Sequence, residues 1–81
     1  MPTIHREKGY LFHFRAGEVL EEPAHIHVEG EKGSMKVWLN EDLEIAYSDL
    51  SAHEEKKVLK IIKTHCEKMK WVWQEYESRT K

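Results

Sequence analysis

Two stretches of alternating apolar and polar residues, 24–29 and 34–39, constrain the fold of this chain more than any other feature. Successive side chains of a strand point to opposite faces of a sheet, so each stretch is typical of a strand with one buried face. Residues 30–33 separate the two stretches and begin and end with glycine. The pattern therefore predicts an antiparallel hairpin.

Pairing across this turn places similar side chains on the same face of both strands. If the turn has four residues, His27 pairs with Lys36 and His25 pairs with Trp38. The face predicted to be buried carries Ile26, Val28, Met35, Val37 and Leu39. The opposite face carries His25, His27, Glu29, Ser34, Lys36 and Trp38. We therefore expect the imidazoles of His25 and His27 to lie together on one partly exposed face.

A second hairpin is predicted nearer the amino terminus. Residues 3–7 and 10–14 are rich in strand-forming side chains and are separated by Lys8-Gly9, a two-residue turn in which glycine supplies a positive φ. The predicted pairs are Glu7 with Tyr10, His5 with Phe12 and Thr3 with Phe14. The aromatic residues of the second strand then share the face that we expect to be buried, and His5 lies among them.

Residues 43–48 alternate once more and predict a fifth strand. We expect Leu43, Ile45 and Tyr47 to face the core, and Glu44 to lie on the same side as the histidines.

The remainder of the chain predicts helix. Glu54 follows Ser51 by three residues, which is the pattern of a capping box. An apolar stripe follows at helical spacing, made of Val58, Ile61, Ile62, Met69, Val72, Trp73 and Tyr76. A continuous helix of about 26 residues would be near 40 Å long, about twice the length of a typical strand. Either its carboxyl half overhangs the sheet, with the outward-pointing Trp71 on a partner surface, or the helix breaks near residues 63–68.

These patterns predict an α+β fold, in which an antiparallel sheet of four or five strands is packed by one long carboxyl-terminal helix in a single domain over residues 1–81. The formal net charge of −2 excludes a global basic field that would attract nucleic acid, so any such site must be local. Cys66 is the only cysteine, and no apolar run reaches membrane length or has the form of a secretory signal. We therefore expect a cytoplasmic protein with no membrane partner.

Three strings carry a resemblance to a known family: G-Y-x-F-x-F from Gly9, P-A-H-I-H-V from Pro23 and K-V-W-L from Lys36. Together with the long helix and its aromatic tail, they make almost the whole chain similar to the small prokaryotic family called domain of unknown function 4160. Members usually have a second proline in place of Ala24 and often an aromatic residue in place of His5. Family genes often stand beside that of another small protein, so the resemblance implies a toxin–antitoxin-like setting and a bacterial source.

The first functional hypothesis is chemistry on RNA. Two imidazoles that titrate near neutral pH can act as base and acid on a ribose hydroxyl and a leaving oxygen, which assigns catalysis to His25 and His27. Lys36 would stabilise the phosphorane charge, and Trp38 would stack on a base. This reaction needs no cofactor.

The second hypothesis is a metal site. Histidines two apart on a strand can chelate Zn²⁺ or Ni²⁺, so His25 and His27 would bind the ion, with Glu29 or Glu44 as a third ligand. His13 joins this group only if the first hairpin lies beside the same face.

The third hypothesis is a binding module without enzymatic activity. Its partner would be the product of the neighbouring gene or a second copy of this chain, with Trp38, Glu44 and Trp71 as contact residues. An H-x-H pair on a solvated sheet face, with no role beyond packing, accounts equally well for His25 and His27.

Overall fold

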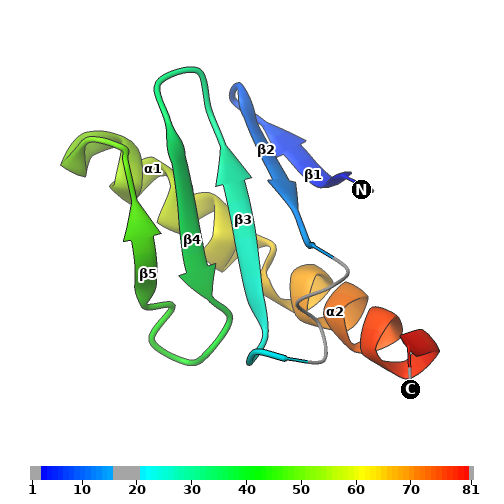
Figure 1. Cartoon of the computed structure of the whole chain (residues 1–81). Coiled ribbons are helices and arrows are strands. Elements are labelled where there is room, and N and C mark those ends of the chain that lie inside the picture. The colour runs from blue at the N-terminus through cyan, green and yellow to red at the C-terminus, as the bar shows by residue number, and fades with distance from the viewer. Residues whose placement is uncertain (1–2, 16–20, 81) are drawn as a thin grey trace.

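Five strands form one antiparallel sheet in which each strand lies beside its neighbour in the chain, and two helices pack against one side of it (Figure 1). This computed structural model describes residues 3–15 and 21–80. The strands are β1 (Thr3–Glu7), β2 (Tyr10–His13), β3 (His25–Glu29), β4 (Ser34–Trp38) and β5 (Ile45–Ser48), and the helices are α1 (Ala52–Thr64) and α2 (Cys66–Thr80). The predicted α+β class and its antiparallel sheet are confirmed.

The two predicted hairpins form with nearly the expected registers. Lys8 and Gly9, with φ angles of 51° and 85°, make the turn between β1 and β2. Both angles are positive, as in the type I′ turn, a two-residue hairpin turn whose twist matches that of the flanking strands. In the second hairpin, every predicted pair forms, including His27 with Lys36 and His25 with Trp38. One predicted pair is wrong: Thr3 lies opposite His13, because the register shifts between Thr3 and His5.

The edge strand β5 departs from the predicted alternation. Its register shifts so that Tyr47 pairs with Lys36, whereas Ile45 pairs with Val37. One extra residue in such an irregularity moves the following side chains to the other face. Tyr47 therefore shares the face of Lys36 and is 51% exposed, so the expectation that it faces the core is wrong.

The helical segment begins as predicted and is divided in two. The hydroxyl of Ser51 accepts a hydrogen bond from the backbone N–H of Glu54, which confirms the cap. The break falls at His65, between α1 and α2, inside the predicted interval 63–68. Just before it, the Thr64 hydroxyl donates to the carbonyl of Lys60, a side-chain bond that often bends helices.

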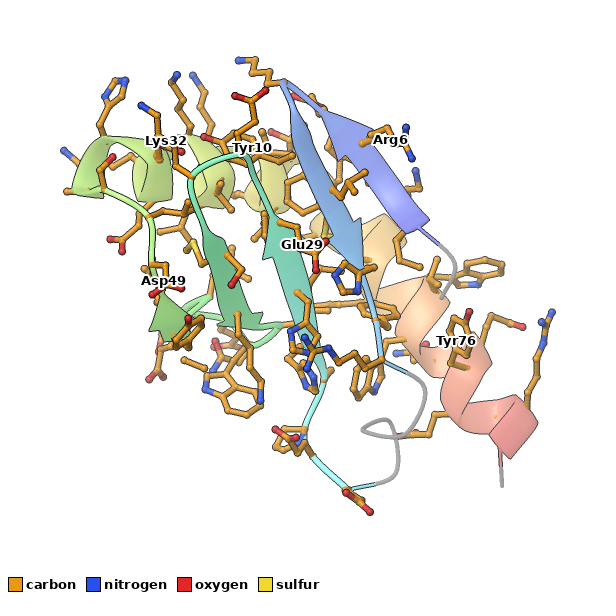
Figure 2. All side chains as sticks on the ribbon, turned by 45° about the horizontal axis from the view of Figure 1, so that its top comes forward. Arg6, Tyr10, Glu29, Lys32, Asp49 and Tyr76 are labelled. Atoms are coloured by element: carbon orange, nitrogen blue, oxygen red, sulfur yellow. The ribbon has the colours of Figure 1, made fainter. Side chains whose placement is uncertain are left out.

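The helices cover only one face of the sheet, and the carboxyl end of α2 extends past the end of the strands (Figure 1). The other face carries a row of paired residues from four strands, His13, His27, Lys36 and Tyr47. We call the face around this row the open face. Glu29 projects from β3 on this side in Figure 2.

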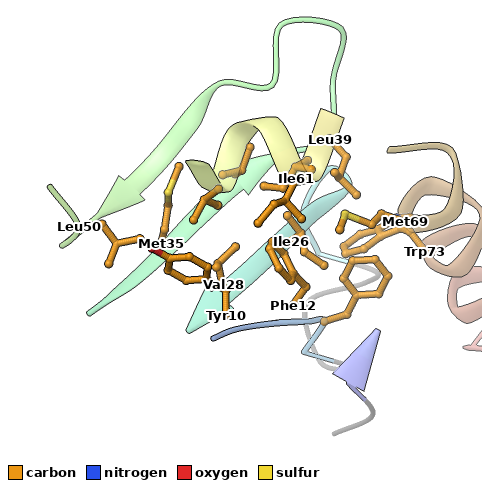
Figure 3. Packing of buried hydrophobic residues seen from close by; sticks show 14 residues of the cluster. Tyr10, Phe12, Ile26, Val28, Met35, Leu39, Leu50, Ile61, Met69 and Trp73 are labelled. Atoms are coloured by element: carbon orange, nitrogen blue, oxygen red, sulfur yellow. The ribbon is translucent and has the colours of Figure 1, made fainter. Parts of the chain in front are cut away.

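The core lies between the sheet and the helices (Figure 3). Its buried apolar residues come from β2, β3, β4, both helices and the segments next to them, namely Tyr10, Phe12, Phe14, Ile26, Val28, Met35, Val37, Leu39, Leu50, Val58, Ile61, Ile62, Met69 and Trp73. Trp73 of α2 meets Phe14 edge-to-face, with ring centroids 5.1 Å apart. Because of the break, α2 can change direction and still bury its apolar side chains against the end of β2.

Among the described residues, neither helix combines the length and the apolar character needed to span a lipid bilayer.

Candidate functional site

A cavity of about 310 Å³ lies on the open face, at the centre of the row of paired residues. Its lining includes Arg15, His27, Glu29, Lys36 and Tyr47. Three of these five side chains are basic or can accept a proton near neutral pH, and only one is acidic. The cavity therefore gathers three basic side chains beside one carboxylate, on a chain whose net charge is negative.

His27 is the member of the histidine pair that reaches this cavity. Its ring stacks on that of His13, with centroids 5.6 Å apart and planes 19° from parallel. The pairing of β2 with β3 brings these two rings together, because His13 lies directly opposite His27. The first hairpin therefore lies beside the face that carries His27, and His13 joins the histidine side chains there.

His25 does not reach the surface. Its side chain is 0% exposed, and its ring lies 5.5 Å from that of Trp38 and 5.0 Å from that of Trp73, between ring centroids. Its Nδ1 lies 2.9 Å from the carbonyl oxygen of Pro23. The expectation that both imidazoles are accessible is therefore wrong for His25, because the indole of Trp73 in α2 packs against this end of β3.

The ammonium group of Lys36 already has two partners. Its Nζ donates to the Glu22 carboxylate at 2.6 Å and lies 4.7 Å from the centroid of the half-buried Trp38 ring. This ion pair offsets part of the charge that Lys36 would offer to a phosphate. The cation also covers part of the ring that was predicted to stack on a base.

His13 is an unusual feature at the margin of the site. Within the described residues, neither of its buried ring nitrogens makes a hydrogen bond. Its Nε2 lies 3.5 Å from the Glu29 carboxylate, too far for a good hydrogen bond. Buried polar groups normally have partners, so an imidazole in this state is a candidate to bind a ligand.

The structure separates the other predicted contact residues from this cavity. Glu44 lies in the loop before β5 with its side chain exposed, and its backbone carbonyl accepts from Trp38. Trp71 is on α2 and is 61% exposed, as expected from its position off the apolar stripe. Its role as a partner contact stays a prediction.

Tyr47 and Arg15 line the cavity, although sequence reasoning did not select them. The phenol of Tyr47 donates a short hydrogen bond to Asp49, and this bond raises the pKa of the phenol above its usual value near 10. Alternation alone placed Tyr47 on the core face of the sheet, and Arg15 belongs to no motif that we identified in the sequence.

A second group of titratable side chains lies on the helix side of the sheet. The carboxylate oxygen Oε1 of Glu7 is 2.9 Å from Nε2 of His5 and 3.2 Å from Nε2 of His65. The rings of His5 and His65 have centroids 4.1 Å apart. The hydrogen bond from His5, together with that from His65, holds the pKa of Glu7 below its usual value, although partial desolvation opposes this.

Among the described residues, His5, Glu7 and His65 are the group of three potential metal ligands whose ligating atoms all lie within 4.8 Å of one another. The ligating atoms of the predicted trio, His25, His27 and Glu29, do not all come this close together. An alternating His-x-Glu at residues 5–7 was the only signal in the sequence for this group. The third member, His65, is brought to it by tertiary packing.

A family model described as domain of unknown function (DUF4160) matches residues 9–74. No curated protein and no solved structure matches the chain. The match covers most of the 81 residues, including both histidines of the H-x-H string and the open-face cavity between β3 and β4. The chain therefore belongs to the DUF4160 family.

Proposed function

We propose that this chain is one protein of a toxin–antitoxin-like two-gene module and that its open face contacts RNA. The observation that carries the proposal is the cavity that brings together Arg15, His27 and Lys36. A chain with a net charge of −2 has no general attraction for a polyanion, so a local basic cluster in a cavity supports specific contact.

Each side chain has a distinct part in this contact. Arg15 is exposed and presents the fork of donors that suits a phosphate group. His27 donates from its ring when protonated, and an incoming phosphate competes with Glu22 for the ammonium group of Lys36. Tyr47, which is 51% exposed, offers a ring on which a base can stack.

We propose contact with RNA in preference to cleavage, because acid–base cleavage by the predicted pair needs two accessible imidazoles. His25 is fully buried, so its part is to position its neighbours. Its ring meets that of His27 edge-on at 5.0 Å and that of Trp38 at 5.5 Å, between centroids. His25 thereby holds both side chains in place on the open face.

The two-gene setting rests on family membership, since DUF4160 genes often stand beside that of another small protein. The proposed partner is the product of that gene. We propose that it binds α2, on which Trp71 is 61% exposed. A bacterial, cytoplasmic protein fits this setting.

The test is binding of a fluorescein-labelled single-stranded RNA, followed by anisotropy at several salt concentrations. The double variant Arg15→Gln/His27→Gln removes two groups from the cavity. We expect it to weaken binding by about 10-fold or more and to flatten the dependence of log K on log salt, because each lost phosphate contact reduces that slope.

The matched control is Lys56→Gln/Lys60→Gln, which removes two exposed lysines from α1. Binding that falls equally in both double variants would show a diffuse charge effect and would contradict an open-face site. Gel analysis of the same RNA checks for shortening. Cleavage by the wild-type protein that is lost in His27→Gln would show that the site is catalytic.

A further inference from the structure

We infer that His5, Glu7 and His65 form a binding site for a divalent transition-metal ion, of which Zn²⁺ is the best fit. Two imidazole nitrogens and one carboxylate oxygen converge here from β1 and from the residue that divides the two helices. All three ligating atoms lie within 4.8 Å of one another.

The two distances from the Glu7 oxygen are close to those of a tetrahedral site. Bonds of about 2.0–2.1 Å from zinc to nitrogen or oxygen place neighbouring ligand atoms about 3.3 Å apart. The Glu7 oxygen lies 2.9 Å from the His5 nitrogen and 3.2 Å from the His65 nitrogen. Small rotations of the three side chains would therefore admit the ion.

The chemistry of the donors selects the class of metal. Imidazole nitrogen suits zinc, nickel and copper, whereas magnesium and calcium prefer sites made of oxygen ligands. Two histidines and one glutamate are also the protein ligands of some zinc sites that keep a fourth position open. The side chains of His5, Glu7 and His65 are 14%, 35% and 31% exposed, so solvent can supply that fourth ligand.

The group is separate from the proposed RNA site. His5 pairs with Phe12, whose ring is buried in the core, so the group lies on the helix side of the sheet. The cavity that contains His27 opens on the other side. Loss of RNA binding in a variant of one site therefore leaves the test of the other unaffected.

Metal binding here would join the amino-terminal strand to the junction of the helices. His65 and Glu7 are 58 residues apart in the chain, and β1 is an edge strand paired only with β2. An ion bound by all three residues favours the folded state over the unfolded one, in which the ligands are dispersed.

The experiment uses untagged full-length protein that has been treated with a chelator and dialysed. Zn²⁺ is added in competition with a chromophoric indicator, which reports stoichiometry and affinity. We expect one ion per chain, with affinity at least about 10-fold weaker in Glu7→Gln and in His65→Gln. Zn²⁺ should also raise the Tm of the wild-type protein, and the same Zn²⁺ concentration should raise that of Glu7→Gln by less.

His53→Gln and His27→Gln are the matched controls, because each removes a histidine outside the group. Both should bind Zn²⁺ as the wild type does. Glu7→Gln keeps the shape of the side chain, so far-UV circular dichroism should confirm that it folds. Absorption by the Co²⁺-substituted protein should have the intensity of a tetrahedral site.

Three outcomes would overturn the inference. The first is the absence of stoichiometric Zn²⁺ uptake by the wild type. The second is uptake that Glu7→Gln and His65→Gln leave intact. The third is uptake lost in His27→Gln, which would assign the ion to the open face and restore the His25 and His27 ligand set.

Discussion

Nε2 of His65 lies 3.2 Å from Oε1 of Glu7, although 58 residues separate the two in the chain. His65 is also the residue at which the helical segment divides, and its own backbone N–H still donates to the carbonyl of Ile61. The break therefore costs little backbone hydrogen bonding. It turns α2 toward the end of β2, where Trp73 meets Phe14.

The contact between Glu7 and His65 links the edge strand β1 to the junction of the two helices. In Glu7→Gln, β1 loses the carboxylate that contacts His65 and keeps its backbone pairing with β2. We expect amide hydrogen exchange to accelerate in β1 and to stay unchanged in the central strand β3. Equal acceleration in both strands would show a global loss of stability instead.

The two histidines of the H-x-H string should differ strongly in their effect on stability. His25→Ala removes a fully buried ring that packs on Trp38 and Trp73, so we expect a loss of about 2–4 kcal/mol. His27→Ala removes a half-buried ring at the cavity and should cost about 1 kcal/mol or less. Urea unfolding with similar m-values measures both, and equal losses would contradict the different burial of the two rings.

The two tryptophans of α2 make a second contrast. Trp73 is 4% exposed and packs on Phe14, so Trp73→Ala should lower the free energy of unfolding by about 3–5 kcal/mol. Trp71 is 61% exposed, and Trp71→Ala should change it by no more than about 0.5 kcal/mol. Thermal unfolding of the two variants, side by side, tests the orientation of α2.

Because Trp71→Ala should fold normally, it can test the proposed partner surface. We expect the product of the neighbouring gene to co-purify with the wild-type chain and with His27→Ala, but to be lost from Trp71→Ala. A complex that survives in Trp71→Ala and dissociates in His27→Ala would place the partner on the open face.

Tyr10 predicts a sensitivity to alkaline pH. Its hydroxyl donates to the Glu54 carboxylate at 3.0 Å, and burial, together with this bond, raises the pKa of the phenol above its usual value near 10. A raised pKa means that the folded state favours the neutral phenol. The stabilisation is therefore fully present below pH 10 and is lost as the pH rises through the folded-state pKa.

Tyr10→Phe should change both the stability at neutral pH and its dependence on alkaline pH. At pH 7 we expect it to be about 1 kcal/mol less stable than the wild type, because the Glu54 carboxylate loses a donor. The difference should shrink above pH 10 in thermal unfolding measured across the alkaline range. A constant difference at every pH would contradict the predicted role of the phenol proton.

The sequence by itself determined the local pairings. The alternation on either side of Gly30 and Gly33 predicted every pair between β3 and β4, because a hairpin with a short turn leaves one register that buries one face. The cap at Ser51 and the turn at Lys8-Gly9 were also predicted from local patterns. Each depends on residues that are close together in the chain.

Only the tertiary structure decided which of these side chains solvent can reach and which distant ones meet. Trp73 buries His25 from α2, a shift in the register of β5 turns Tyr47 outward, and His65 reaches Glu7 from the far end of α1. Periodicity predicts the face on which a side chain lies, but burial and clustering depend on packing between elements far apart in the chain. That packing depends on the shapes and volumes of the side chains that meet, and a local sequence pattern does not predict which side chains meet.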